Sequence, residues 1–144
     1  MAGITRILVV DDFQPFRAWV LSVLRDKPTL RVVAEACHGA RAVQKAQELR
    51  PDLILLDIGL PKRNGIEVAR QVRDLSPNSK ILFLSQETAS EVLQEAMDAG
   101  AAGYVSKSKA GAELLQAIDG VLIGEQCVGT APVPTNHRRV TKKA

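Results

Sequence analysis

Apolar residues along this chain follow two alternating patterns. Five short apolar runs, rich in Val, Ile and Leu, predict β-strands, and they cover residues 6–10, 30–36, 53–56, 80–85 and 103–107. After each run, apolar residues recur every three or four positions, as on one face of a helix, over residues 13–24, 40–49, 65–75, 88–99 and 114–122. A strand followed by a helix, five times over, predicts an α/β fold: a doubly wound, five-stranded parallel sheet with helices on both faces.

The stretch from Leu53 to Pro61 is the most informative one. Four consecutive apolar residues, Leu53 to Leu56, are typical of a strand that is buried on both faces of a parallel sheet. They lead directly into the carboxylate of Asp57, and the turn formers Gly59 and Pro61 follow. We therefore expect Asp57 at the carboxyl end of a central strand, where open α/β sheets bind their ligands.

Local signals mark several helix ends. Thr88 and Glu91 have the spacing of a capping box, which predicts that the fourth helix starts directly after Thr88. Gly100 suits the end of that helix. Pro28 and Pro51 follow the first and second helical stretches, which they cannot continue.

Polar residues stand at or just beyond the ends of four predicted strands. These residues are Asp11, Asp12, Asp57, Ser85 and Lys107. Because parallel strands all point the same way, we expect these side chains to gather at one edge of the sheet. Taken alone, Asp12 suits a helix cap and Lys107 a solvated charge. It is the complete set that predicts a binding site.

Three carboxylates at one edge of a sheet repel one another, which raises the pKa of at least one of them. A hard divalent cation with oxygen ligands relieves this repulsion. Mg²⁺ fits best, because it commonly takes one or two carboxylates, keeps several waters and leaves room for phosphate oxygens. A lysine and a hydroxyl at the rim could then hold the remaining oxygens of a phosphoryl group.

Length and composition limit the possible classes of protein but indicate no further functional residues. The 144 residues are enough for one compact domain, and 46% hydrophobic with 24% charged residues is ordinary for a soluble protein. No apolar run approaches the roughly 20 residues that cross a bilayer, and the N-terminus lacks a signal-peptide pattern. We therefore expect a cytoplasmic protein with no membrane segment. Cys37 and Cys127 match no metal or redox spacing and are expected to be free thiols.

The positive charge of the chain is concentrated at its C-terminus. Residues 130–144 carry four basic residues and no acid, so the preceding 129 residues sum to −1 within the formal net charge of +3. The four are Arg138, Arg139, Lys142 and Lys143. The basic character of the chain therefore indicates no nucleic-acid-binding face on the folded part.

At the strand ends the chain resembles the receiver domain of two-component response regulators (CheY-like), over about residues 5–124. The features in common are an acid pair after the first strand, a single acid and a turn after the third, a hydroxyl after the fourth and a lysine at the fifth. They are carried by Val9-Val10-Asp11-Asp12, Leu55-Leu56-Asp57, Leu60-Pro61, Asn64-Gly65, Ser85 and Gly103-Tyr104-Val105-Ser106-Lys107. The segment from Ala99 to Ser108 and Gly124-Glu125-Gln126 look most like the NarL/FixJ subgroup.

This resemblance implies a flavodoxin-like receiver fold with strand order 2-1-3-4-5. Residues 1–128 would form the receiver domain, and residues 129–144 a basic tail or linker that we expect to be disordered. Asp57 would be the phosphoacceptor, taking a phosphoryl group from a sensor histidine kinase or a phosphotransfer protein. Mg²⁺ would be held by Asp11, Asp12 and Asp57 and by the backbone carbonyl of Gly59.

The resemblance also implies a switch. Lys107 would pair with a phosphoryl oxygen, and Ser85 would move inward to hydrogen-bond the phosphoryl group. Tyr104 would follow into the vacated space, which couples the site to the surface of the fourth helix, fifth strand and fifth helix. A homodimer on phosphorylation is a further expectation.

Three departures from the family pattern, at Gly59, Gln86 and Ser108, limit what the resemblance carries over. Gln86 stands where the family usually has a small residue, and Ser108 stands where many receivers have Pro. Gly59 leaves room for an attacking water beside the metal. We expect Gly59, Gln86 and Glu87 to shift the lifetime of the phosphoryl group.

Two alternatives stay open. The chain could be a receiver-like interaction module that is never phosphorylated, or an aspartate-nucleophile phosphatase of the haloacid dehalogenase type. The phosphatase is less well matched, because Asp11 and Asp12 are adjacent and no length remains for a cap domain. We expect no enzyme activity beyond self-phosphotransfer and autodephosphorylation. Only about 15 residues follow the predicted receiver domain (residues 1–128), too few for a helix-turn-helix module, so we expect no direct DNA binding by this chain.

Overall fold

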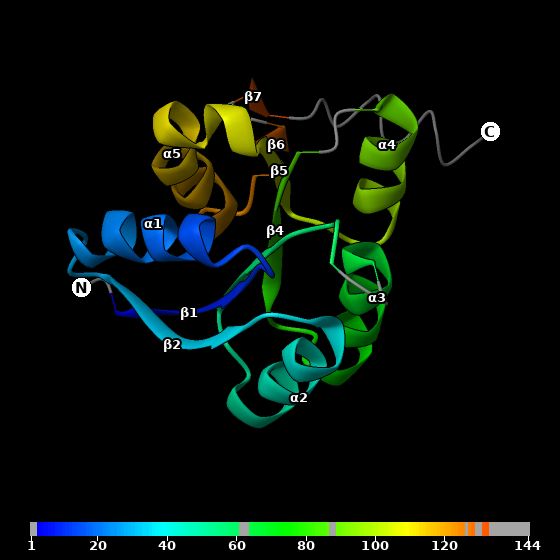
Figure 1. Cartoon of the computed structure of the whole chain (residues 1–144), viewed down its shortest axis with the longest axis horizontal. Helices are drawn as coiled ribbons and strands as arrows, with labels where there is room; N and C mark the ends of the chain where they lie inside the picture. Colours follow the sequence, from blue (N-terminus) through cyan, green and yellow to red (C-terminus); the bar gives the residue numbers. More distant parts are fainter. Residues whose placement is uncertain (1–2, 61–63, 87–88, 126, 129–130, 133–144) are drawn as a thin grey trace.

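A computed structural model describes residues 3–60, 64–86, 89–125, 127–128 and 131–132 (Figure 1). Strands and helices alternate along the chain as the hydrophobic pattern predicts. Their bounds are β1 (Thr5–Val10), α1 (Gln14–Arg25), β2 (Leu30–Ala36), α2 (Gly39–Leu49), β3 (Leu53–Leu56), α3 (Gly65–Leu75), β4 (Lys80–Ser85), α4 (Ser90–Asp98), β5 (Gly103–Ser106) and α5 (Ala110–Leu122). A single 3-10 turn, Lys107–Lys109, joins β5 to α5.

The first five strands are parallel and lie in the order β2-β1-β3-β4-β5, which confirms the predicted topology. The register aligns their carboxyl ends: Val10 of β1 pairs with Leu56 of β3, and Leu56 pairs with Phe83 of β4. All four residues of β3 are buried, as expected for a central strand covered on both faces.

Each face of the sheet has its own hydrophobic core. Alternate residues of each strand point to opposite faces, so Leu8 and Ile54 lie in one core while Ile7 and Leu53 lie in the other. The first core is completed by α2, α3 and α4. The second is completed by α1 and α5. The helices therefore cover both faces, as predicted.

The N-terminal ends of two helices, α4 and α5, differ from the sequence-based prediction. The capping residue of α4 is Ala89, which makes no side-chain cap hydrogen bond, and the helix starts at Ser90. The prediction that Thr88 caps this helix is wrong in that respect; Thr88 itself lies outside the described residues. The fifth helix starts at Ala110, four residues before the first predicted position, because small residues in its first turn hide the apolar period.

The sheet also continues beyond the five predicted strands. β6 (Cys127–Val128) pairs in parallel with β5, and β7 (Ala131–Pro132) pairs antiparallel with β6. Each has only two residues, too few to show an alternating pattern in the sequence. Among the described residues, no helix combines the length and the hydropathy that crossing a membrane requires.

Candidate functional site

The predicted site residues meet at the carboxyl edge of the sheet. Asp11 and Asp57 follow β1 and β3 directly, and their backbone amides extend the sheet: Asp57 N–H donates to the Val10 carbonyl and Asp11 N–H to the Ala36 carbonyl, each at 3.0 Å. Ser85 is the last residue of β4, and Lys107 is the first residue after β5. Parallel pairing therefore places four side chains from distant parts of the sequence at one edge.

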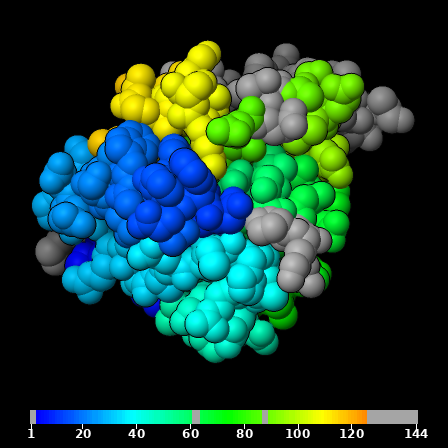
Figure 2. Space-filling model, viewed as in Figure 1, coloured from blue at the N-terminus to red at the C-terminus, as the bar shows by residue number. Residues whose placement is uncertain are grey.

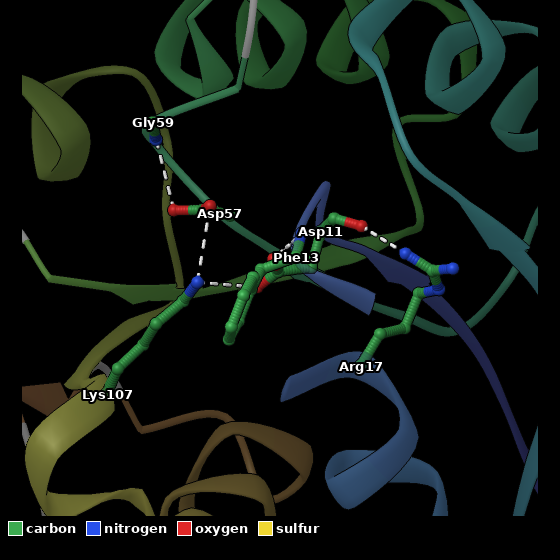
Figure 3. A network of polar contacts seen from close by, with 6 residues as sticks. All are labelled: Asp11, Phe13, Arg17, Asp57, Gly59 and Lys107. Atoms are coloured by element: carbon green, nitrogen blue, oxygen red, sulfur yellow. Dashed lines mark hydrogen bonds and ion pairs between the residues drawn. The ribbon is translucent and has the colours of Figure 1, made fainter. Parts of the chain in front are cut away.

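Lys107 joins the two buried carboxylates (Figure 3). Its ammonium nitrogen lies 2.8 Å from Oδ2 of Asp11 and 3.4 Å from Oδ2 of Asp57. The side chains of Asp11, Asp57 and Lys107 are 4%, 7% and 11% exposed. At such burial, two carboxylates require a nearby cation, and Lys107 supplies it.

Asp57 has a raised pKa, in the direction that the sequence predicts but chiefly for another reason. Burial of the carboxyl group raises its pKa most. The Gly59 amide, which donates to Oδ1 of Asp57 at 3.0 Å, and the charge of Lys107 both lower the pKa in part. Repulsion by Asp11, the predicted cause, contributes less than any of these three.

Three carboxylates converge closely enough to hold one cation. Asp11, Asp12 and Asp57 each offer an oxygen atom, and these atoms all lie within 4.8 Å of one another. Asp11 and Asp57 are buried, whereas Asp12 is exposed. An all-oxygen set that is open to water on one side suits Mg²⁺, which keeps part of its hydration shell.

The acidic cluster opens into a cleft of about 810 Å³ at the molecular surface. Asp12, Phe13 and Phe16 line its α1 side, and Gly59, Ser85, Gln86, Ser106, Lys107 and Ser108 line the rest together with Asp57 and Ile58. The space-filling view shows this face of the molecule, on which the blue start of α1 meets the green and yellow segments (Figure 2). A group of phosphoryl size can reach Asp57 through such an opening.

Ser85 and Tyr104 are both buried. Ser85 is 2% exposed and lines the cleft, and Tyr104 is 5% exposed within the core that α2, α3 and α4 cover. The ring centroid of Tyr104 lies 6.4 Å from that of Phe83. The predicted hydroxyl and aromatic residue are therefore both inside the molecule, on neighbouring strands.

Two residues of α1 that no sequence pattern marked also belong to the site. The Lys107 ammonium lies over the Phe16 ring, 4.6 Å from its centroid, so the ring shields and holds the cation. Arg17 donates to the backbone carbonyl of Asp11 at 2.6 Å. In the sequence, Phe16 reads only as an apolar helix residue. Arg17 has no signal at all, because its acceptor is a backbone atom.

Comparison with known proteins finds one matching family and several similar regulators. The family model described as "Response regulator receiver domain" matches residues 7–119. A putative transcriptional regulator of Pseudomonas aeruginosa is 38% identical over 120 residues, which are 83% of this chain and 58% of that protein. The nitrate/nitrite response regulator NarL of Escherichia coli is 34% identical over 128 residues, 89% of this chain and 59% of NarL. This chain thus spans somewhat more than half the length of these relatives.

A relative of another kind is a protein-glutamate methylesterase of Alkalilimnicola ehrlichii, 41% identical over 71% of this chain and 26% of that protein. Among solved structures, a LuxR-family two-component response regulator from Aurantimonas has a TM-score of 0.84 at 32% identity, with 98% of each chain covered. The receiver domain of a response regulator NarL from Mycobacterium tuberculosis has a TM-score of 0.80 at 30% identity, covering 85% of this chain and 98% of the other.

Proposed function

Because this chain belongs to the family of response regulator receiver domains, we propose that it acts as a phosphorylation-operated signalling switch whose phosphoacceptor is Asp57. The phosphoryl donor would be a sensor histidine kinase or a phosphotransfer protein in the cytoplasm, and Mg²⁺ would be required. The observation that supports this most directly is the buried Asp57 carboxylate at the base of an open cleft, beside Lys107 and two further acids.

In the proposed transfer, an ionised oxygen of Asp57 attacks the phosphorus atom of a phosphohistidine. The P–O bond forms as the P–N bond breaks, and the departing imidazole nitrogen keeps the electron pair and takes up a proton from solvent. Lys107 already points its ammonium at Asp57, from 3.4 Å, so it can pair with an oxygen of the arriving group. Bound Mg²⁺ would neutralise charge on the phosphoryl oxygens.

Asp11, Asp12 and Asp57 are the side chains that would hold the metal ion. Gly59 would add its backbone carbonyl; its amide is engaged with Asp57. The small size of Gly59 favours access of water to this side of the cleft, so we propose that Gly59, Gln86 and Glu87 shorten or lengthen the phosphoryl lifetime. Glu87 lies outside the described residues.

We further propose that Ser85 hydrogen-bonds the phosphoryl group and that Tyr104 transmits the change to α4, β5 and α5. Their burial on adjacent strands supports this coupling. A new surface there would favour a homodimer. Residues 1–128 would constitute the receiver, and residues 129–144, of which Ala131–Pro132 form β7, a tail or linker.

The test is a phosphorylation assay. The protein is incubated with Mg²⁺ and acetyl phosphate, and its intact mass is followed, with Trp19 fluorescence and oligomeric state in parallel. We expect one phosphoryl adduct on the wild type and on Asp74→Asn, a matched variant of an exposed acid on α3. We expect none on Asp57→Asn. Absence of any adduct on the wild type would favour the interaction-module alternative.

A further inference from the structure

Arg17 connects three elements behind the acidic cluster. It lies in the first turns of α1, and its side chain is 16% exposed. One guanidinium nitrogen, Nη1, donates to the backbone carbonyl of Asp11 at 2.6 Å, and Nε donates to Oε1 of Glu35 on β2 at 2.8 Å. The first of these bonds is visible in Figure 3. A planar guanidinium held at two points has a defined orientation.

The carbonyl that Arg17 holds belongs to the peptide group between Asp11 and Asp12. Because a peptide group is planar, fixing its oxygen also fixes the direction in which the chain enters Asp12. Asp11 has other restraints: its amide donates to Ala36, and its carboxylate accepts from the Phe13 amide at 2.8 Å and pairs with Lys107. Asp12 is exposed, and no hydrogen bond to its carboxylate is found within the described part of the chain.

We propose that Arg17, aligned by Glu35, is a positioning residue for the metal site: it holds the Asp11–Asp12 peptide so that both carboxylates face Asp57. This inference rests on the proposed function in one respect, that Mg²⁺ is the ion bound. Arg17 touches none of the reacting groups. It acts through the backbone of Asp11, and Glu35 acts through Arg17.

Electrostatics alone predicts the opposite effect of losing Arg17. Removing a cation close to three carboxylates increases the local negative potential and should tighten the binding of Mg²⁺. Loss of positioning should weaken it, because the acids no longer converge. The direction of the change in Mg²⁺ affinity in Arg17→Gln therefore separates the two effects.

The experiment is a calorimetric Mg²⁺ titration of the full chain. The variants are Arg17→Gln, Arg17→Lys, Glu35→Gln and, as a control, Arg25→Gln, which removes one positive charge from the exposed C-terminal end of the same helix. We expect Kd to rise about tenfold in Arg17→Gln, the lower end of the range for groups that orient metal ligands. Glu35→Gln and Arg17→Lys should show a smaller rise, and Arg25→Gln less than about a twofold change.

A kinetic readout distinguishes positioning from general damage to the fold. In phosphorylation by acetyl phosphate, the Mg²⁺ concentration for half-maximal rate should rise in Arg17→Gln in step with Kd, while the rate at saturating Mg²⁺ returns to near the wild-type value. If Arg17→Gln does not fold, Arg17→Lys and Glu35→Gln carry the same test.

The titration and the kinetic assay can each overturn the positioning role of Arg17. A Kd in Arg17→Gln that is unchanged or lower than in the wild type overturns the inference and leaves the proposed function standing, as does a rate that excess Mg²⁺ fails to restore. A wild type that binds no Mg²⁺ overturns the metal requirement of the proposed function, and this inference falls with it.

Discussion

At the scale of single residues, the burial of Asp57 conflicts with the need for an ionised carboxylate. Burial disfavours its charge, yet an ionised carboxylate is needed both to attack phosphorus and to bind a cation. Gly59 and Lys107 offset part of the cost, and the remainder leaves the pKa of Asp57 raised. The proposed chemistry therefore uses a carboxylate whose ionised form is destabilised by burial when no metal ion is bound.

Substituting Asp57 by Asn should stabilise the metal-free protein at neutral pH. Because the folded state raises the pKa of Asp57, folding stability falls as pH rises from the ordinary value through the raised one, and above that range the ionised group is a net penalty. We expect Asp57→Asn to increase the free energy of unfolding at pH 7 by about 1 kcal/mol, the usual size of a stabilising substitution. Denaturant unfolding in the presence of a chelator measures this, with Asp74→Asn as the control.

The pH profile gives a second check on Asp57→Asn. Its advantage over the wild type should shrink as the pH falls toward 3.8, the ordinary pKa of an aspartate, because the raised pKa lets the folded wild type take up its proton before that point is reached. An Asn variant that is less stable than the wild type at pH 7 would contradict the assignment of burial as the dominant influence on Asp57.

Lys107 should matter for stability even before any phosphoryl group arrives. Lys107→Met would leave Asp11 and Asp57 buried without their cation, at a cost of about 2 kcal/mol, below the range for a fully buried pair because water still reaches the cleft. Mg²⁺ should recover part of this loss, since it can replace the missing charge. Thermal unfolding with and without Mg²⁺ measures both effects. Lys109→Met, two residues on and exposed, should show neither.

At the scale of elements, the turn after β3 depends on one close contact. Gly65, the first residue of α3, donates its amide to the Ile58 carbonyl at 2.7 Å, and a Cβ placed on it would lie 2.2 Å from the backbone oxygen of Asp57. The helix can approach the backbone at Asp57 this closely only because residue 65 has no side chain.

Gly65→Ala should therefore displace the Asp57 backbone. We expect a loss of about 1–3 kcal/mol in unfolding free energy, the usual cost of overpacking, together with slower phosphorylation. Gly111→Ala is the matched control: it lies in the first turn of α5 with nothing within 4 Å of the added Cβ. It should be neutral or slightly stabilising. Equal effects of the two substitutions would disprove the close-contact explanation.

Sequence patterns predict some elements of this molecule far better than others. Buried strands such as β3 and the amphipathic helices follow from apolar periodicity, and the parallel order then brings Asp11, Asp57 and Lys107 together. The start of α4 was missed because a capping box is only a local preference, which the surrounding fold overrides. The contacts of Arg17 and Gly65 were missed because both involve backbone oxygens, which have no residue identity to recognise.

At the scale of the whole molecule, the site lies where the path of the chain changes direction. After β1 the chain crosses by α1 to β2 on one side, and β3 then lies on the other side of β1. The crossing helices separate at this point, α1 to one face and α2 to the other, and leave the carboxyl ends of β1 and β3 uncovered. Asp11 and Asp57 stand at these two ends, so the topology itself opens the cleft.

The short strands β6 and β7 have a consequence for solubility. An unpaired strand edge exposes a row of hydrogen-bonding groups that can recruit another chain, and natural sheets protect such edges with short strands or with proline. β6 occupies the outer edge of β5, and the strand that then becomes outermost, β7, has two residues and ends in Pro132. We therefore expect a chain that stops at Gly124 to self-associate with increasing concentration, as measured by light scattering, whereas one that stops at Pro132 should stay dispersed.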